Sequence, residues 1–347
     1  MAKPFLALLA LATGSCTGTW NKQSADLLFG VSPVPAGASQ GSNGRGAERP
    51  AGDIAVRDVV RASFKIAGEH LQPCLSAERK RKIASLKPIT ISNRSNVQVL
   101  SYYDPATKTI TVSELTWRNF VYSALSSRMI DMNVGTDLEW HARYRLYLRM
   151  KSPFDQVESP PKIAGLNKDW TSADSARELF AYVLQEAQYN ATFLLAHEYY
   201  HHLEPISQAL NESNGQFLQR RQQHELDADN FAMIMLMCRS AIDGKLDVLL
   251  KVPLLFLDWV LLLQGQKSSL ISPTHPMDHR RMRNASAFVI SKLEMLHLTG
   301  QRLSLIEGFR ELIAKADRID REGPENFFAT IDAEARSVTR SSLLLKN

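Results

Sequence analysis

A glutamate and two histidines lie within the five-residue segment His197-Glu198-Tyr199-Tyr200-His201, which has the pattern H-E-x-x-H. On a helix, residues four apart project from one face, so both imidazoles can reach a single zinc ion at about 2.0–2.1 Å. Glu198 stands beside the first histidine, where its carboxylate can take a proton from a zinc-bound water. The segment therefore predicts a zinc site with His197 and His201 as ligands and Glu198 as general base.

A second cluster supports this interpretation, because the first pattern alone arises by chance in roughly one chain in a hundred of this length. Glu225-Leu226-Asp227-Ala228-Asp229 follows 24 residues after His201. Glu225 and Asp229 share a helix face, so Glu225 can complete three protein ligands and leave the fourth position to water. Asp229 can accept a hydrogen bond from the free ring nitrogen of a ligand histidine. Asp227 faces elsewhere and is predicted to be a surface carboxylate.

Two helices must carry these residues. A capping box formed by Ser175 and Glu178 predicts the start of the first, which runs toward Leu203 with a break near Asn190. Apolar residues just before His197 indicate that this helix is buried. The second helix is predicted over 217–239, after a loop at 211–215.

The remaining pattern predicts a mainly helical α+β fold with a small sheet or hairpin. Two strands joined by a turn at Asp104–Thr107 form the clearest hairpin, over 98–103 and 109–113. Helical spacing is found over 54–88 with a break near Pro73, and over 115–150, 276–298 and 302–317. The apolar segment 246–263 is interrupted by charges and a proline, which favours a core or interfacial helix over a membrane span.

H-E-x-x-H followed by E-x-x-x-D resembles the gluzincin metallopeptidases, in particular the CAAX prenyl endopeptidase group and its soluble periplasmic quality-control relatives. Thr274-His275-Pro276, with Arg281 six residues after the histidine, is similar to a segment of that group. The resemblance implies a zincin-like fold and places His275 and Arg281 at the cleft, where they would help to stabilise the oxyanion of the tetrahedral intermediate. It also implies that the hairpin at 98–113 aligns an extended substrate by β-addition.

Several residues near the motifs depart from that pattern. Tyr200 stands where the family usually has a small residue. His202 points about 100° away from the ligand face and is not counted as a ligand. His224 and His279 are predicted to be solvated. Cys238 is interpreted as a buried small hydrophobe; a disulfide with Cys74 is possible after export but has no support in the sequence.

The amino terminus has the layout of a signal peptide over residues 1–15, with Lys3 before the apolar run Phe5–Ala12. Cys16 follows small residues, as at a lipoprotein cleavage site, so lipid anchoring and ordinary cleavage both remain open. Residues 16–52 are predicted to be a flexible linker and 53–347 the metallopeptidase domain. The expected location is the periplasm or envelope; a cytoplasmic location, with a buried N-terminal helix, is the alternative.

Composition excludes several classes of protein. The chain has 347 residues, 44% of them hydrophobic, and a net charge of +5 from 41 basic and 36 acidic residues. These values are typical of a globular protein rather than a disordered one. The basic run Arg79–Lys82 is interpreted as a solvated helix face, so no nucleic-acid partner is expected. Serine-hydrolase, Walker and dinucleotide-binding motifs are not recognisable.

Together these features predict a zinc-dependent endopeptidase with one Zn²⁺ per chain, which hydrolyses peptide bonds in protein substrates. Two alternatives remain. One is a zinc-binding chaperone or scaffold that does not cleave its clients, which Tyr200 and the apolar segment 246–263 would suit. The other is a cytoplasmic regulatory or phage-exclusion protease with a narrow target.

Overall fold

The structure is a computed structural model of the chain. It describes residues 56–92, 101–113, 116, 120, 123–124, 173–209, 212–246, 248–252, 278–295, 300–323, 326–327, 329–330 and 333. The predicted signal peptide (1–15), the linker (16–52), His275 and most of the helix predicted over 115–150 lie outside these residues.

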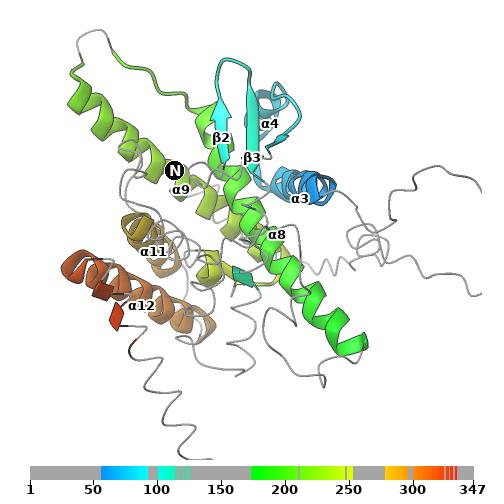
Figure 1. Cartoon of the computed structure of the whole chain (residues 1–347), viewed down its shortest axis with the longest axis vertical. Helices are drawn as coiled ribbons and strands as arrows, with labels where there is room; N and C mark the ends of the chain where they lie inside the picture. The colour runs from blue at the N-terminus through cyan, green and yellow to red at the C-terminus, as the bar shows by residue number, and fades with distance from the viewer. Residues whose placement is uncertain are drawn as a thin grey trace, which may run out of the picture.

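The described part is mainly helical with one small sheet, which confirms the predicted fold class. The elements in chain order are α3 (Val56–Leu71), the 3-10 helix η1 (Gln72–Cys74), α4 (Ala77–Ile83), β1 (Thr90–Ser92), β2 (Ser101–Asp104), β3 (Thr109–Ser113), α8 (Ala173–Leu203), α9 (Asn214–Asp243), α11 (Asp278–Glu294) and α12 (Gly300–Glu322) (Figure 1). None of the described helices combines the length and apolar character that a bilayer span needs.

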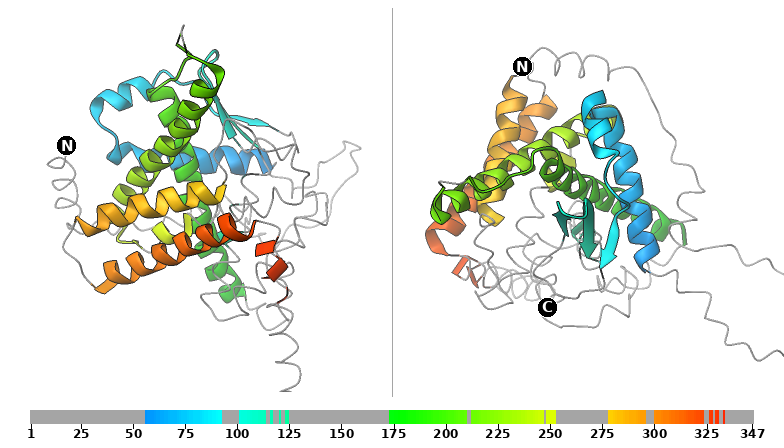
Figure 2. Two further views of the ribbon diagram at one scale, coloured as in Figure 1. Left: turned by 90° about the vertical axis from the view of Figure 1, so that its left-hand side faces the viewer. Right: turned by 90° about the horizontal axis from the view of Figure 1, so that it is seen from above.

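Helix α8 forms the centre of the molecule. Every residue from Glu186 to Tyr199 is buried, so this part of the helix is covered on all sides. Helices α3 and α9 and strand β2 pack against it, α11 packs on α9, and α12 packs on α11 (Figure 2). The break predicted near Asn190 is absent, and α8 begins at Ala173, two residues before the predicted cap Ser175. Neighbouring helices therefore keep the helix continuous.

The sheet has the strand order β1-β3-β2. The predicted hairpin is confirmed: β2 and β3 are antiparallel, with Tyr102 opposite Thr111. Asp104 fixes the turn, since its carboxylate accepts hydrogen bonds from the Ala106 amide at 2.9 Å and the Thr107 hydroxyl at 2.7 Å. Strand β1, which pairs with β3 in parallel, was not predicted. Among the described residues β3 is the only neighbour of β2, so β2 is an edge strand beside α8.

Helix α9 has defined ends. Ser213 and Gln216 form a capping box, with the Gln216 amide 3.3 Å from the Ser213 hydroxyl. Gly244 ends the helix in the left-handed conformation, with φ of 68°. The helix therefore begins three residues earlier than predicted, inside the expected loop at 211–215.

A disulfide joins Cys74 in η1 to Cys238 in α9, with 5.9 Å between their Cα atoms. The two cysteines are 164 residues apart in the chain. This pairing was left open at the level of the sequence, because the approach of the two cysteines depends on how α3 and α9 fold around α8. The bridge ties the N-terminal part of the described chain to a helix that carries candidate metal ligands.

We expect loss of this disulfide to lower stability, because it closes a long loop in the unfolded chain. Cys74→Ser or Cys238→Ser should lower the free energy of unfolding by about 2–5 kcal/mol, measured by urea denaturation. Dithiothreitol should lower the urea midpoint of the wild type and leave unchanged the midpoint of a variant that carries both substitutions. Equal midpoints for wild type and variants without reductant would contradict the expectation.

Candidate metal centre

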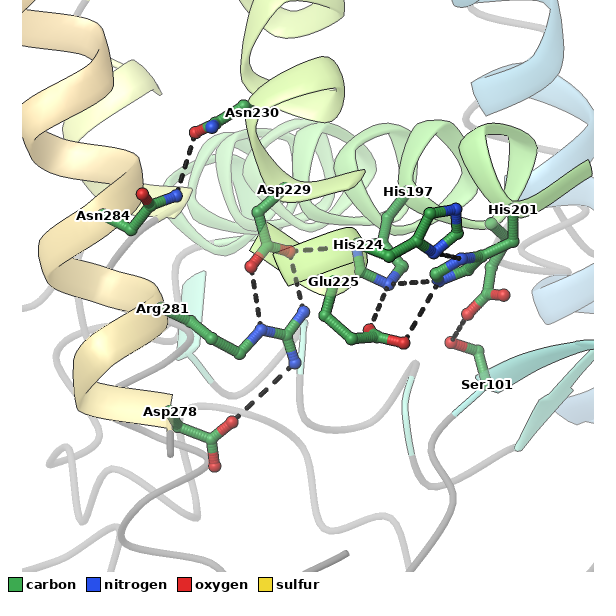
Figure 3. Close-up of polar contacts among 11 residues, drawn as sticks. Ser101, His197, His201, His224, Glu225, Asp229, Asn230, Asp278, Arg281 and Asn284 are labelled. Carbon is green, nitrogen blue, oxygen red and sulfur yellow. Dashed lines mark hydrogen bonds and ion pairs between the residues drawn. The ribbon is translucent and has the colours of Figure 1, made fainter. Parts of the chain in front are cut away.

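Helices α8 and α9 bring together the three residues that the sequence assigns as metal ligands (Figure 3). Nε2 of His197 lies 3.0 Å from Nε2 of His201. The Glu225 carboxylate faces both rings, with one oxygen 3.3 Å from the first nitrogen and the other 3.6 Å from the second. His197 and Glu225 are buried and His201 is partly buried. The predicted donors thus converge on one point between two helices.

This donor set fits a zinc ion. Two imidazole nitrogens and a carboxylate are typical of catalytic zinc sites, which keep a fourth position for water or substrate. A tetrahedron with bonds of about 2.05 Å has donor atoms about 3.3 Å apart. The separations of 3.0, 3.3 and 3.6 Å are close to that spacing. The three side chains could therefore bind the ion with small rotamer adjustments.

Asp229 and Arg281 support His197 on the Nδ1 side of its ring, away from the other metal donors. Nδ1 of His197 lies 2.9 Å from a carboxylate oxygen of Asp229. Arg281 donates two hydrogen bonds to the same carboxylate, from Nε at 2.8 Å and from Nη2 at 2.7 Å (Figure 3). The bond between His197 and Asp229 leaves Nε2 of the ring directed at the other donors.

The electrostatics of this cluster favour a positive charge between the helices. Burial lowers the pKa of His197, but the bonds to Asp229 and Glu225 outweigh it and raise that pKa to about 10. Burial opposes ionisation of Asp229, yet the Arg281 guanidinium holds the pKa of that carboxyl below its usual value. A proton on His197 or a divalent cation at the donors would each compensate the carboxylates.

Glu198 lies beside the donors and points toward the sheet. The Ser101 hydroxyl, at the start of β2, donates a 2.6 Å hydrogen bond to Oε1 of Glu198. Its other oxygen is buried and has no hydrogen-bond partner among the described residues. Burial raises the pKa of Glu198, the Glu225 charge adds to the rise, and His197 and Ser101 oppose it. A buried carboxylate with a raised pKa, and with one oxygen that accepts no hydrogen bond from the described residues, is suited to accept a proton.

The second histidine has an unexpected neighbour. Nδ1 of His201 lies 3.2 Å from Nδ1 of His224, whose own Nε2 is 2.6 Å from the backbone oxygen of Glu204. The ring of Tyr200 packs on His224 with centroids 5.1 Å apart. His224 was predicted to be solvated; it is half-buried, and both of its ring nitrogens have protein partners. Tyr200 fills the space between α8 and α9 and contacts Phe231 as well.

Two other histidines have structural contacts. His202 bridges the hairpin and α4, since its Nδ1 is 2.8 Å from the Tyr103 hydroxyl and its Nε2 is 3.0 Å from the Lys82 backbone oxygen. It points away from the metal donors, as predicted. His279 was predicted to be solvated, but it is buried and its Nε2 lies 2.8 Å from Asp320 of α12. Its sequence context gave no sign of this contact, which depends on the packing of α11 on α12.

The resemblance placed His275 and Arg281 beside the oxyanion. His275 lies outside the described residues. Arg281 is buried in α11, where its side chain is bonded to Asp229, and its Nη1 lies 3.8 Å from Asp278. Burial raises the pKa of Asp278 to about 6. In this structure Arg281 thus acts on His197 through Asp229, and contact with a substrate oxygen remains a prediction.

Comparison with known proteins gives one match. Residues 157–296 match the family model described as Peptidase U49. That segment contains α8, α9 and α11, and therefore every candidate metal ligand. The match supports a peptidase acting on protein substrates; its description names neither a metal nor the gluzincin group. Searches of curated proteins and of solved structures found no match.

We expect Arg281 to be needed for stability, because its loss leaves the Asp229 carboxylate buried without its guanidinium partner. Arg281→Met should lower the free energy of unfolding by about 3–5 kcal/mol, measured by urea denaturation. Arg280→Met is the matched control, since Arg280 is the preceding residue of α11 and its side chain is exposed. Equal free energies of unfolding for the two variants would show that the contact between Arg281 and Asp229 does not stabilise the fold.

Proposed function

We propose that the protein is a zinc-dependent endopeptidase. The single observation that carries the proposal is the convergence of His197, His201 and Glu225 at spacings suited to zinc, beside the buried Glu198. Family similarity to a peptidase supports hydrolysis of peptide bonds. Zinc, when bound there, would polarise the scissile carbonyl and lower the pKa of a water molecule to about 7.

The chain's own residues have separate tasks in this reaction. Glu198 takes the proton from the attacking water and delivers it to the nitrogen of the leaving amine. Ser101 holds one oxygen of Glu198, which leaves the other oxygen to exchange the proton. Asp229 and Arg281 orient His197. A role for His275 and Arg281 at the oxyanion remains part of the proposal by resemblance alone.

Strand β2 offers a place for the substrate backbone. It is an edge strand within the described sheet, and Ser101 at its start contacts the proposed base. An extended substrate segment that pairs with β2 would therefore pass beside Glu198. Main-chain hydrogen bonds of this kind hold many sequences, which suits unfolded or misassembled proteins as substrates.

We further propose that the protein is exported to the periplasm or envelope. The signal-like residues 1–15 support this, and Cys16 offers a lipid anchor. The disulfide between Cys74 and Cys238 also supports it, because such bonds persist in oxidising compartments. Sequencing the amino terminus of the protein purified from cells tests this proposal. Residues 1–15 should be absent, and retention of Met1 to Ala12 would contradict export.

The proposed chemistry predicts that Glu198→Gln keeps the metal and loses turnover, because the amide cannot accept the proton. Wild type and variant should each bind about one zinc per chain by elemental analysis, while casein cleavage by the variant falls at least ~100-fold. Glu225→Ala should lose both zinc and activity. Chelation should inactivate the wild type, and added zinc should restore it.

The two alternatives give different results in the same experiment. One zinc per chain without cleavage of any denatured protein would favour the chaperone or scaffold. Cleavage restricted to a single target in a peptide-library digest would favour the narrow-target protease. Undiminished casein cleavage by Glu198→Gln would exclude the proposed mechanism.

A further inference from the structure

The two ring nitrogens of His201 face different surroundings. Its Nε2 points at His197 and Glu225, and its Nδ1 points at His224 (Figure 3). A histidine binds a metal through a nitrogen that carries no proton. If Nε2 of His201 is the ligand atom, Nδ1 must hold the ring proton and needs an acceptor.

The backbone oxygen of Glu204 decides which nitrogen of His224 is that acceptor. A carbonyl oxygen only accepts hydrogen bonds, so Nε2 of His224, at 2.6 Å, must be the donor. In a neutral imidazole the other nitrogen is then an acceptor. Nδ1 of His224 can therefore receive the proton of Nδ1 of His201 at 3.2 Å. The opposite order of protons would leave a carbonyl and an unprotonated nitrogen facing each other.

The His224 ring is fixed on both sides. It lies 5.1 Å from the Tyr200 ring, tilted by 48°, and 5.0 Å from the His201 ring, tilted by 34°. Glu204 follows the last residue of α8, where backbone oxygens have no partner within the helix. His224 thus bonds to the carboxyl end of the same helix that carries His201. This anchor holds the ring independently of any metal.

We propose that His224 is a positioning residue that fixes the tautomer of His201 and so prepares its Nε2 to bind the metal. The inference rests on the proposed function, because it assumes a metal at His197, His201 and Glu225. The two ligand histidines are then oriented by unlike partners. Asp229 holds His197 as a buried carboxylate, and His224 holds His201 as a neutral imidazole bonded to a helix end.

The first test measures zinc affinity by competition with a chelator. His224→Leu should weaken zinc binding about 10–100-fold, because it removes the acceptor. His224→Asn keeps an oxygen at the position of Nδ1 and should recover most of that loss. Gln223→Leu is the matched control, since Gln223 is the preceding residue, is exposed, and bonds through its amide to Asp227. Zinc affinity of His224→Leu within about twofold of wild type would overturn the proposal.

The second test uses wild-type protein and does not depend on a variant that folds. Long-range ¹H–¹⁵N correlation spectra of the zinc-loaded protein, with ¹⁵N-labelled histidine, should show Nδ1 of His201 and Nε2 of His224 protonated. A proton on Nδ1 of His224 would overturn the assignment. If the wild type binds zinc but these two nitrogens are not the protonated ones, the metal site is retained and the positioning role of His224 is refuted. If wild type binds no zinc, the proposed function fails as well.

Discussion

The bidentate contact between Arg281 and Asp229 is the interaction on which the centre depends. It holds a fully buried carboxylate ionised, and that carboxylate orients the His197 ring. Burying such charges is costly unless each one has a partner. The contact also joins α11 to α9, so the packing of these two helices and the donor cluster are stabilised together. Supporting side chains from two packed helices thus hold the His197 ring in place, which suits ligands that must keep a fixed geometry.

Much of this arrangement could be predicted from spacing alone. Residues four apart on a helix share a face whatever the tertiary structure, so His197 with His201, and Glu225 with Asp229, were placed correctly as pairs. The hairpin was equally local, because Asp104 supplies its own turn hydrogen bonds. That the two helical pairs would face each other was an inference from chemistry, and the packing of α8 on α9 agrees with it.

The features that sequence reasoning missed depend on contacts between distant parts of the chain. In the sequence His224 is one polar residue in a polar segment. Only the position of the end of α8 shows that its two ring nitrogens contact His201 and the backbone oxygen of Glu204. His279 is buried because α12 brings Asp320 to it. Strand β1 has one exposed and two half-buried residues without alternation, and its pairing with β3 is parallel and non-local. No short-range signal exists for any of them.

The disulfide between Cys74 and Cys238 closes a covalent ring in the chain. Between Cys74 and Cys238 the chain forms a closed ring that includes Ser101, all three metal donors, Glu198 and Asp229. A single nick anywhere inside that ring leaves both fragments attached to each other, so the active helices can survive internal clipping as one molecule. A nick between Cys238 and α11 is different, because it separates α11 and Arg281 from the ring and leaves only non-covalent packing to retain them.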